Sequence, residues 1–181
     1  MPRHLHVFDP PERFVAGTVG QPGDRTFYLQ ATGGGRTVSV ALEKAQVSLL
    51  AEKLAELLEE VRRRGIDVPV GPAREIEDVA PLDTPVEEEF RVSTLALGFE
   101  VDERRVVVEA QAATEGEPAE LSDDDQDGPD TLRVRVTPEA ALAFVARAAR
   151  VVAAGRPPCP LCGLPLDPSG HICPRMNGFR S

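Results

Sequence analysis

Residues 37–64 read TVSVALEKAQVSLLAEKLAELLEEVRRR, and this stretch decides the fold. Its first residues alternate apolar with small or polar side chains, which is typical of a half-buried strand. From Val47 onward the apolar residues recur at steps of three and four, the spacing of one helix face. Three arginines at 62–64 favour the negative end of the helix dipole, and Gly65 follows as a stop. The stretch therefore predicts one strand that runs directly into one long helix.

Two further strands are predicted ahead of this strand and helix. Residues 13–20 and 25–31 read as strands, and Gln21-Pro22-Gly23-Asp24 between them has the composition of a turn. Gly33-Gly34-Gly35 forms the next turn. Consecutive glycines also occur in phosphate-binding loops, but the lysine and the hydroxyl residue of such a loop do not follow here. The predicted order of elements is β-β-β-α.

A second copy of this unit is predicted in the C-terminal half of the chain. Residues 131–152 match residues 37–58 without a gap, so Phe144 takes the place of Leu50 on the apolar helix face. Thr137-Pro138-Glu139 offers a hydroxyl cap, a proline for the first helical position and an acid, which together indicate a helix start.

The strands before this second helix repeat less clearly. Residues 91–98 begin with arginine and end with glycine like residues 13–20, and Gln111-Ala112 resembles Gln30-Ala31. Chance alternation in short strands is the rival explanation to duplication. We expect an α+β fold: a duplicated β-β-β-α unit with an antiparallel sheet and two long helices, plus a small C-terminal zinc knuckle. Two such units would pair about a pseudo-twofold axis with their helices on one side.

The predicted domain boundaries divide the chain into a body and a tail. The body covers residues 1–155, with repeat one at about 13–65, a proline-rich and acidic linker at 66–89 and repeat two at about 90–155. The tail covers residues 156–181.

An acidic segment at residues 114–130 separates the last two predicted strands. It contains Asp123-Asp124-Asp125-Gln126-Asp127-Gly128, whose spacing is typical of a calcium loop. Leu132 and Arg133 stand where such a loop needs its closing glutamate, and no helices flank the segment. A solvated acidic loop is the interpretation.

The tail holds the most specific chemical motif. Cys159 and Cys162, followed by glycine, form a Cys-x-x-Cys-Gly knuckle in which a tight turn brings two thiolates onto one ion. His171 and Cys173 follow after an eight-residue arm and complete a closed tetrahedral set. We predict a structural Zn²⁺ ion bound by Cys159, Cys162, His171 and Cys173. A metal-free tail and a Cys159–Cys162 redox pair are the alternatives.

The histidines are few, and they assemble no catalytic set. Residues 4–8 alternate like a short edge strand, so His4 and His6 read as exposed strand residues, with a metal half-site beside Asp9 as the alternative. The third histidine, His171, belongs to the predicted zinc set. No Ser-His-Asp or Cys-His arrangement can be defended, and no catalytic residue is predicted.

Composition excludes several classes of function. The net charge of −10 argues against a nucleic-acid-binding surface, which needs clustered Lys and Arg. One tyrosine and no tryptophan leave few platforms for base stacking. No run of eighteen apolar residues predicts a membrane span, and residues 1–8 lack the apolar region of a signal peptide. A cytoplasmic protein is expected.

A family resemblance rests on four stretches: residues 8–20, Leu29-Gln30-Ala31, residues 40–44 and the tail from 159 to 178. Together they resemble an actinobacterial family of unknown function, over nearly the whole chain. That family is one of a conserved trio of hypothetical proteins, whose other members are similar to a phosphatidylinositol-kinase-like and a histidine-phosphatase-like protein. The resemblance implies protein partners within the trio and supplies no catalytic residue.

Two functions of different classes remain open. The first is a zinc-containing binding or adaptor protein whose tail docks a partner, and the lack of a catalytic set favours it. The second is an enzyme or small-molecule-binding protein with a polar cleft between the two repeats. If there is a pocket at the first helix start, Glu43-Lys44 and Arg25 would line it. Plain surface charge is the simpler interpretation of these residues.

Overall fold

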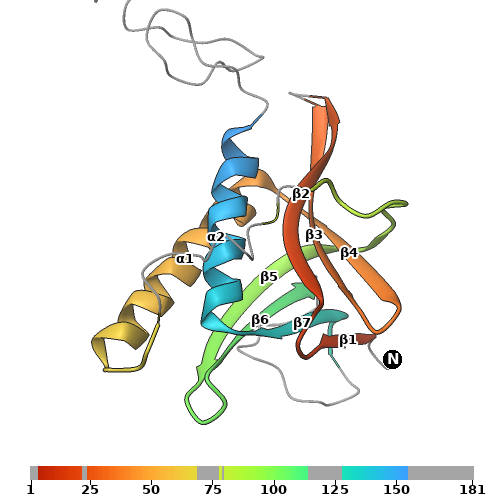
Figure 1. Ribbon diagram of the computed structural model, residues 1–181. Helices are drawn as coiled ribbons and strands as arrows, with labels where there is room; N and C mark the ends of the chain where they lie inside the picture. The colour runs from red at the N-terminus through yellow and green to blue at the C-terminus, as the bar shows by residue number, and fades with distance from the viewer. Residues whose placement is uncertain (1–3, 22–23, 69–77, 79, 114–127, 155–181) are drawn as a thin grey trace, which may run out of the picture.

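The computed structural model describes residues 4–21, 24–68, 78, 80–113 and 128–154. Within them, seven strands form one mixed sheet and two helices cover it, which makes the protein α+β as predicted (Figure 1). In chain order the elements are β1 (Leu5–Phe8), β2 (Arg13–Gln21), β3 (Asp24–Gly33), β4 (Arg36–Leu42), α1 (Lys44–Arg63), β5 (Glu88–Glu100), β6 (Arg105–Ala112), β7 (Thr131–Val136) and α2 (Pro138–Ala153). Neither of these helices is long and apolar enough to cross a membrane.

The strand order is β1-β7-β6-β5-β4-β3-β2. Each predicted unit forms a three-stranded antiparallel meander, but β4 pairs with β5 in parallel and β1 pairs with β7 in parallel. The prediction of antiparallel pairing is therefore confirmed within each unit and wrong for the complete sheet, which is mixed. The physical reason is the connection through α1, because a strand–helix–strand crossover returns the chain to the same end of the sheet.

The two units are not related by a twofold axis perpendicular to the sheet. Such an axis would reverse the order of the second unit's strands relative to the first. The observed sheet instead continues β2-β3-β4 with β5-β6-β7 in the same order and direction, as a shift along the sheet would. The crossover through α1 sets this arrangement, since it lays β5 beside the last strand of the first unit.

The two strand-to-helix junctions lie at matching positions in the ungapped alignment of residues 37–58 with residues 131–152. β4 ends at Leu42 and α1 begins at Lys44, while β7 ends at Val136 and α2 begins at Pro138. The two helix starts use different caps. Thr137 accepts a hydrogen bond from the Ala140 amide, whereas Glu43 and Gln46 form a reciprocal capping box at the start of α1.

The match of the two Gln-Ala pairs is out of register. Ala31 lies opposite Val38 in the first meander, and Ala110 lies opposite Leu132 in the second. Because Leu132 corresponds to Val38, the counterpart of Ala31 is Ala110 and not Ala112. The dipeptide identity is a coincidence of sequence, while the alternation around it is shared.

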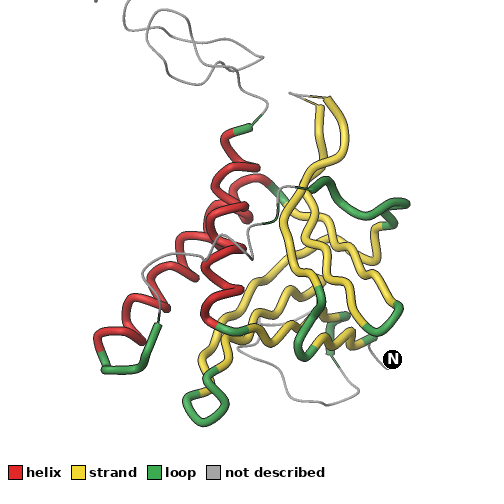
Figure 2. The backbone as a smooth tube through the Cα atoms, in the orientation of Figure 1, coloured by secondary structure: helices red, strands yellow, loops and turns green. Residues whose placement is uncertain are grey.

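The core lies between the helices and one face of the sheet (Figure 2). Leu29, Val40, Val106 and Leu54 are among its most buried side chains. α2 contacts β2 as well as β6 and β7, although these strands lie in different halves of the sheet. The sheet therefore curls so that its β2 edge meets the helix of the second unit.

β1 confirms the short edge strand predicted for residues 4–8, although it begins at Leu5. The rings of His4 and His6 stack with 6.4 Å between their centroids. Among the described residues, no group of three or more His, Cys, Asp or Glu side chains could hold a metal ion. The acidic segment 114–127 and the tail 155–181 lie outside the described residues.

Candidate functional site

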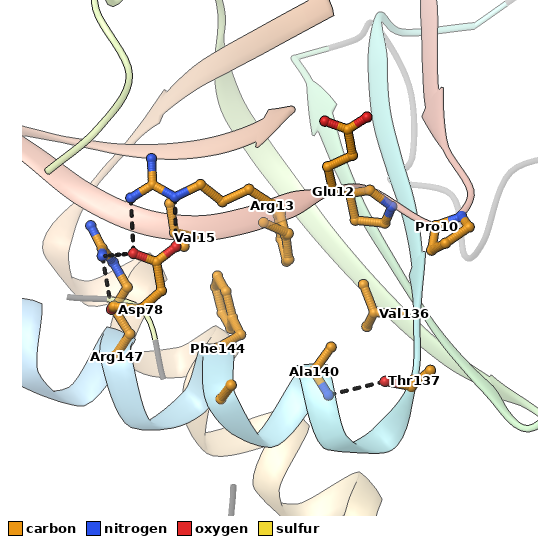
Figure 3. Close-up of a pocket in the computed structure, with 13 residues that line it drawn as sticks. Pro10, Glu12, Arg13, Val15, Asp78, Val136, Thr137, Ala140, Phe144 and Arg147 are labelled. Atoms are coloured by element: carbon orange, nitrogen blue, oxygen red, sulfur yellow. Dashed lines mark hydrogen bonds and ion pairs between the residues drawn. The ribbon is translucent and has the colours of Figure 1, made fainter. Parts of the chain in front are cut away.

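A cavity of about 390 Å³ lies between β2 and the first half of α2 (Figure 3). It thus lies between the first and the second β-β-β-α units, because the curl of the sheet brings the β2 edge to α2. The residues that line it come from the lead into β2, from β2 itself, from the linker and from the junction of β7 with α2: Pro10, Pro11, Glu12, Arg13, Phe14, Val15, Asp78, Val136, Thr137, Ala140, Ala143, Phe144 and Arg147.

Two stacked aromatic rings form the apolar part of the cavity wall. Phe14 of β2 and Phe144 of α2 lie with their ring centroids 4.6 Å apart and their planes 8° from parallel. Val15 and Val136 add aliphatic surface, while Ala140 leaves space because its side chain is small. The cavity can therefore accept an apolar body against a wall that tight packing holds in place.

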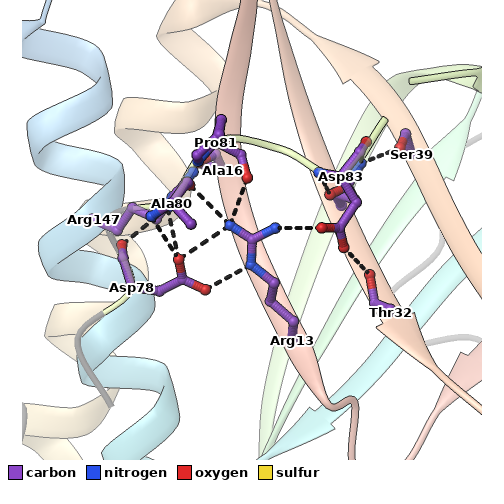
Figure 4. Close-up of polar contacts among 10 residues, drawn as sticks. Arg13, Ala16, Thr32, Ser39, Asp78, Ala80, Pro81, Asp83 and Arg147 are labelled. Carbon is purple, nitrogen blue, oxygen red and sulfur yellow. Dashed lines mark hydrogen bonds and ion pairs between the residues drawn. The ribbon is translucent and has the colours of Figure 1, made fainter. Parts of the chain in front are cut away.

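A fork of hydrogen bonds between Arg13 and Asp78 forms the polar end (Figure 4). Nε of Arg13 donates to Oδ2 of Asp78 at 2.6 Å, and Nη2 donates to Oδ1 at 3.1 Å. Nη2 also donates to the carbonyls of Ala80 and Pro81, each at 2.9 Å. A planar guanidinium matches a carboxylate in this bidentate way, so the two side chains fix each other's orientation.

Arg147 joins this fork from the opposite side. Arg147 is 6 % exposed, and its Nε donates to the Ala16 carbonyl of β2 at 2.8 Å. Its Nη1 donates to the backbone carbonyl of Asp78 at 2.9 Å and to Oδ1 of Asp78 at 3.1 Å. Arg147 thereby ties α2, β2 and the linker together at one point.

The charges of this cluster shift one another. The hydrogen bond from Arg13 holds the pKa of Asp78 below its usual range, against the effect of burial, and the charge of Arg147 acts in the same direction. Burial lowers the pKa of Arg147, but a guanidinium stays protonated at neutral pH. Asp78 is therefore a carboxylate between two cations at neutral pH.

Local sequence explains how the three side chains meet. Arg147 follows Phe144 by three residues on α2, so both point to the same side of the helix. The linker reaches the cluster because Asp83 exchanges hydrogen bonds with the buried Gln30, at 2.8 and 3.0 Å. Leu82 packs over Gly17 so closely that a Cβ there would lie 2.5 Å from the leucine side chain.

The structure does not place Glu43, Lys44 or Arg25 in this cavity. Glu43 takes part in the cap of α1 and pairs with Arg91 at 2.7 Å. Arg25 donates to the Ala154 carbonyl at the end of α2 at 3.1 Å. The predicted zinc ligands Cys159, Cys162, His171 and Cys173 lie outside the described residues.

Two residues of the site escaped the sequence analysis. Asp78 lies in the proline-rich linker, where no periodicity indicates which side chains face the body. Arg147 lies in a mostly apolar stretch of α2. It is three residues after the predicted core position Phe144, which is about one helical turn. A cation on the same helix face as the core position Phe144 was the available signal for a buried arginine.

A family model described as "Protein of unknown function (DUF3090)" matches residues 6–173. The matched range includes every strand and helix of the body, apart from the first residue of β1, and all four predicted zinc ligands. No curated protein matches the chain, and no solved structure does.

Proposed function

The chain belongs to the family described as a protein of unknown function, DUF3090, and we propose that it binds a small molecule in the cavity between β2 and α2. The observation that carries this proposal is the cavity itself, with aromatic rings on one side and a fixed arginine–aspartate cluster on the other. Ligand sites of proteins typically have volumes of about 300–1,000 Å³, apolar walls and a few convergent polar groups.

Binding is favoured over catalysis by the state of the polar groups. Asp78 accepts hydrogen bonds from two guanidinium groups, and its lowered pKa makes it a poor proton acceptor at neutral pH. The hydroxyl of Thr137 serves as the cap of α2. These groups are arranged to hold a ligand rather than to move its protons.

Filling the cavity should weaken this binding. N-Phenyl-1-naphthylamine, a neutral fluorescent probe, is expected to bind the full-length protein with one site per chain. Ala143→Phe places an aromatic ring inside the cavity, since Ala143 lines it. We expect the dissociation constant, measured by fluorescence titration, to rise by about tenfold or more, which corresponds to about 1.4 kcal/mol.

Ala149→Phe is the matched control, because Ala149 lies exposed on the same helix and does not line the cavity. The control should bind the probe like the wild type. Unchanged binding by Ala143→Phe, or equal loss in both variants, would contradict the proposed site. Far-UV circular dichroism of each variant separates loss of the site from loss of the fold.

We also propose that the tail binds one structural Zn²⁺ ion through Cys159, Cys162, His171 and Cys173. Support comes from the ligand spacing, which suits the tetrahedral coordination that zinc adopts in structural sites. Such a closed site would stabilise the tail and leave no open position for a reacting water.

Elemental analysis of the purified protein should find one zinc per chain. Cys159→Ser should lower the zinc content by at least about half, because three ligands hold the ion less tightly than four. Ser169→Ala, in the arm between the two ligand pairs, should leave the zinc content unchanged. A wild-type protein purified without chelator that holds no zinc would contradict this site.

The remaining proposals concern organisation and partners. The recurring order β-β-β-α supports an origin of the body, residues 1–155, by duplication, with residues 156–181 as a separate tail. We propose that the tail docks a protein partner, and the resemblance to the actinobacterial trio points to its kinase-like or phosphatase-like members. A cytoplasmic location fits this proposal.

A further inference from the structure

We infer that the ligand of this cavity is an amphipathic organic acid, whose carboxylate or phosphate group binds the guanidinium of Arg147 in exchange with the side chain of Asp78. The inference rests on the proposed small-molecule site and adds the chemical class of the ligand. The argument follows from the donors of Arg147, the state of Asp78 and the charges at this end of the cavity.

Arg147 has a donor group to offer. A guanidinium carries five N–H donors, and the hydrogen bonds of Arg147 run from Nε to Ala16 and from Nη1 to Asp78. No described residue accepts a hydrogen bond from its Nη2. The only fully buried side-chain donor without a partner among the described residues is Nε of Arg135, so Nη2 of Arg147 keeps contact with solvent. Because Arg147 lines the cavity, the 6 % of its surface that is exposed meets solvent there.

Arg147 lines two neighbouring cavities. Besides the one beside Phe144, it lines a second and more open cavity of about 370 Å³ toward the end of α2, together with Arg150. Asp78 borders both cavities. An acidic group at Nη2 of Arg147 would thus sit where the two cavities meet, while its apolar body lies against Phe144, one helical turn away.

Asp78 occupies the place that an external acid would take. Its two carboxylate oxygens accept the charge-assisted hydrogen bonds of Arg13 and Arg147, and its side chain is 30 % exposed. An oxyanion of similar geometry can replace a carboxylate on a guanidinium without a new site being built. The side chain of Asp78 is close enough to the surface to swing away when that exchange occurs.

Several charged side chains among the described residues lie at this end of the cavity. Arg13, Arg147 and Arg150 stand against the carboxylates of Asp78 and Asp83, with 3.3 Å between Nη1 of Arg13 and Oδ1 of Asp83. Glu12 also lines the cavity, but it lies at the other end, beside Pro10 (Figure 3).

Two probes with the same ring system separate the contribution of the acidic group to binding from that of the apolar body. 8-Anilinonaphthalene-1-sulfonate has the same rings as N-phenyl-1-naphthylamine and adds one sulfonate. The measured quantity is the ratio of the two dissociation constants for the full-length folded protein. We expect the wild type to prefer the sulfonate, and Arg147→Gln to reduce that preference, measured as the ratio of the two constants, by about tenfold.

Asp78→Asn should shift the ratio in the opposite direction. It removes the competing charge and leaves the two arginines available, so the preference for the sulfonate should rise. This variant also keeps the inference testable if Arg147→Gln does not fold. Arg150→Gln, which removes an exposed cation near Asp78, is the control for a general effect of charge and should change the ratio by less than about twofold.

Displacement of the bound sulfonate by short-chain ligands distinguishes the acids. Octanoate and octyl phosphate carry the two candidate groups on one chain, and octanol is their neutral counterpart. Stronger displacement by either acid than by octanol supports the inference and identifies the preferred group. Equal displacement by all three, or a ratio that neither Arg147→Gln nor Asp78→Asn alters, would overturn it.

These failures differ from failure of the proposed function. If Ala143→Phe weakens binding of the neutral probe, the small-molecule site stands even when the ligand has no acidic group. A ratio that Arg150→Gln lowers as much as Arg147→Gln would assign the preference to the general field rather than to the buried guanidinium, and would equally overturn the inference.

Discussion

Phe144→Ala is expected to lower the free energy of unfolding by about 3–5 kcal/mol, and Leu50→Ala by about 2–5 kcal/mol. Both side chains are 2 % exposed and occupy corresponding positions on α2 and α1. Truncation removes buried apolar surface and leaves a cavity that the surrounding side chains fill only in part. For Phe144 the stacking on Phe14 is lost as well.

Urea unfolding followed by circular dichroism measures these changes. Leu49→Ala is the matched control, because Leu49 is the neighbour of Leu50 and is 49 % exposed. It should change the free energy of unfolding by less than about 0.5 kcal/mol. A cost near zero for Leu50→Ala or Phe144→Ala would mean that the corresponding helix face does not pack on the sheet.

Glu109→Ala should have an effect of similar size for a different reason. The side chain of Glu109 is 1 % exposed, pairs with Nε of Arg133 at 2.8 Å and accepts a hydrogen bond from Gln111 at 3.1 Å. Glu109 and Arg133 lie opposite each other on β6 and β7. Removing one partner of a buried ion pair typically costs about 3–5 kcal/mol, because the other charge loses its compensation in a region of low dielectric constant.

An exposed ion pair supplies the comparison for Glu109. Lys53 and Glu56 on α1 are 3.2 Å apart with both side chains more than half exposed, so Glu56→Ala should cost no more than about 1 kcal/mol. The same urea titration reports both variants. Equal effects at the two sites would show that the Glu109 pair is screened by solvent like the surface pair.

The local elements of this fold are predictable because their signals are local. The change from period two to period three or four at residues 42–47 identifies the junction of β4 with α1, and the same change before Pro138 identifies the start of α2. Cap residues confirm the positions, since Thr137 caps its helix as its sequence neighbourhood predicts.

The arrangement of the strands was not predictable in the same way. Pairing of β4 with β5 depends on where the chain returns after α1, and no residue in either strand encodes that neighbour by periodicity. A meander contains the information for antiparallel pairing in its short turns, whereas a long crossover leaves direction and position to the packing of the helix. The parallel pairing of β4 with β5, and the placement of the second unit beside the first in the same strand order, are therefore seen only in the structure.

The lining of the cavity was not predictable from the sequence. A polar cleft between the two units was the second of the two predicted alternatives, and the cavity lies between these units. Its polar residues come from a strand, a linker and a helix that meet only after folding: Arg13, Asp78 and Arg147 are distant in sequence. The predicted zinc set is the opposite case, because its ligands are close in sequence and spacing alone defines the motif.

The position of bound N-phenyl-1-naphthylamine tests the central claim most directly. Intermolecular nuclear Overhauser effects between the probe and the protein locate the probe without a mutation. The cavity between β2 and α2 predicts contacts from the probe to the methyl groups of Val15 and Val136 and to the ring of Phe144. Contacts confined to the exposed side chains of Leu49 or Val101, with none to the cavity wall, would contradict it.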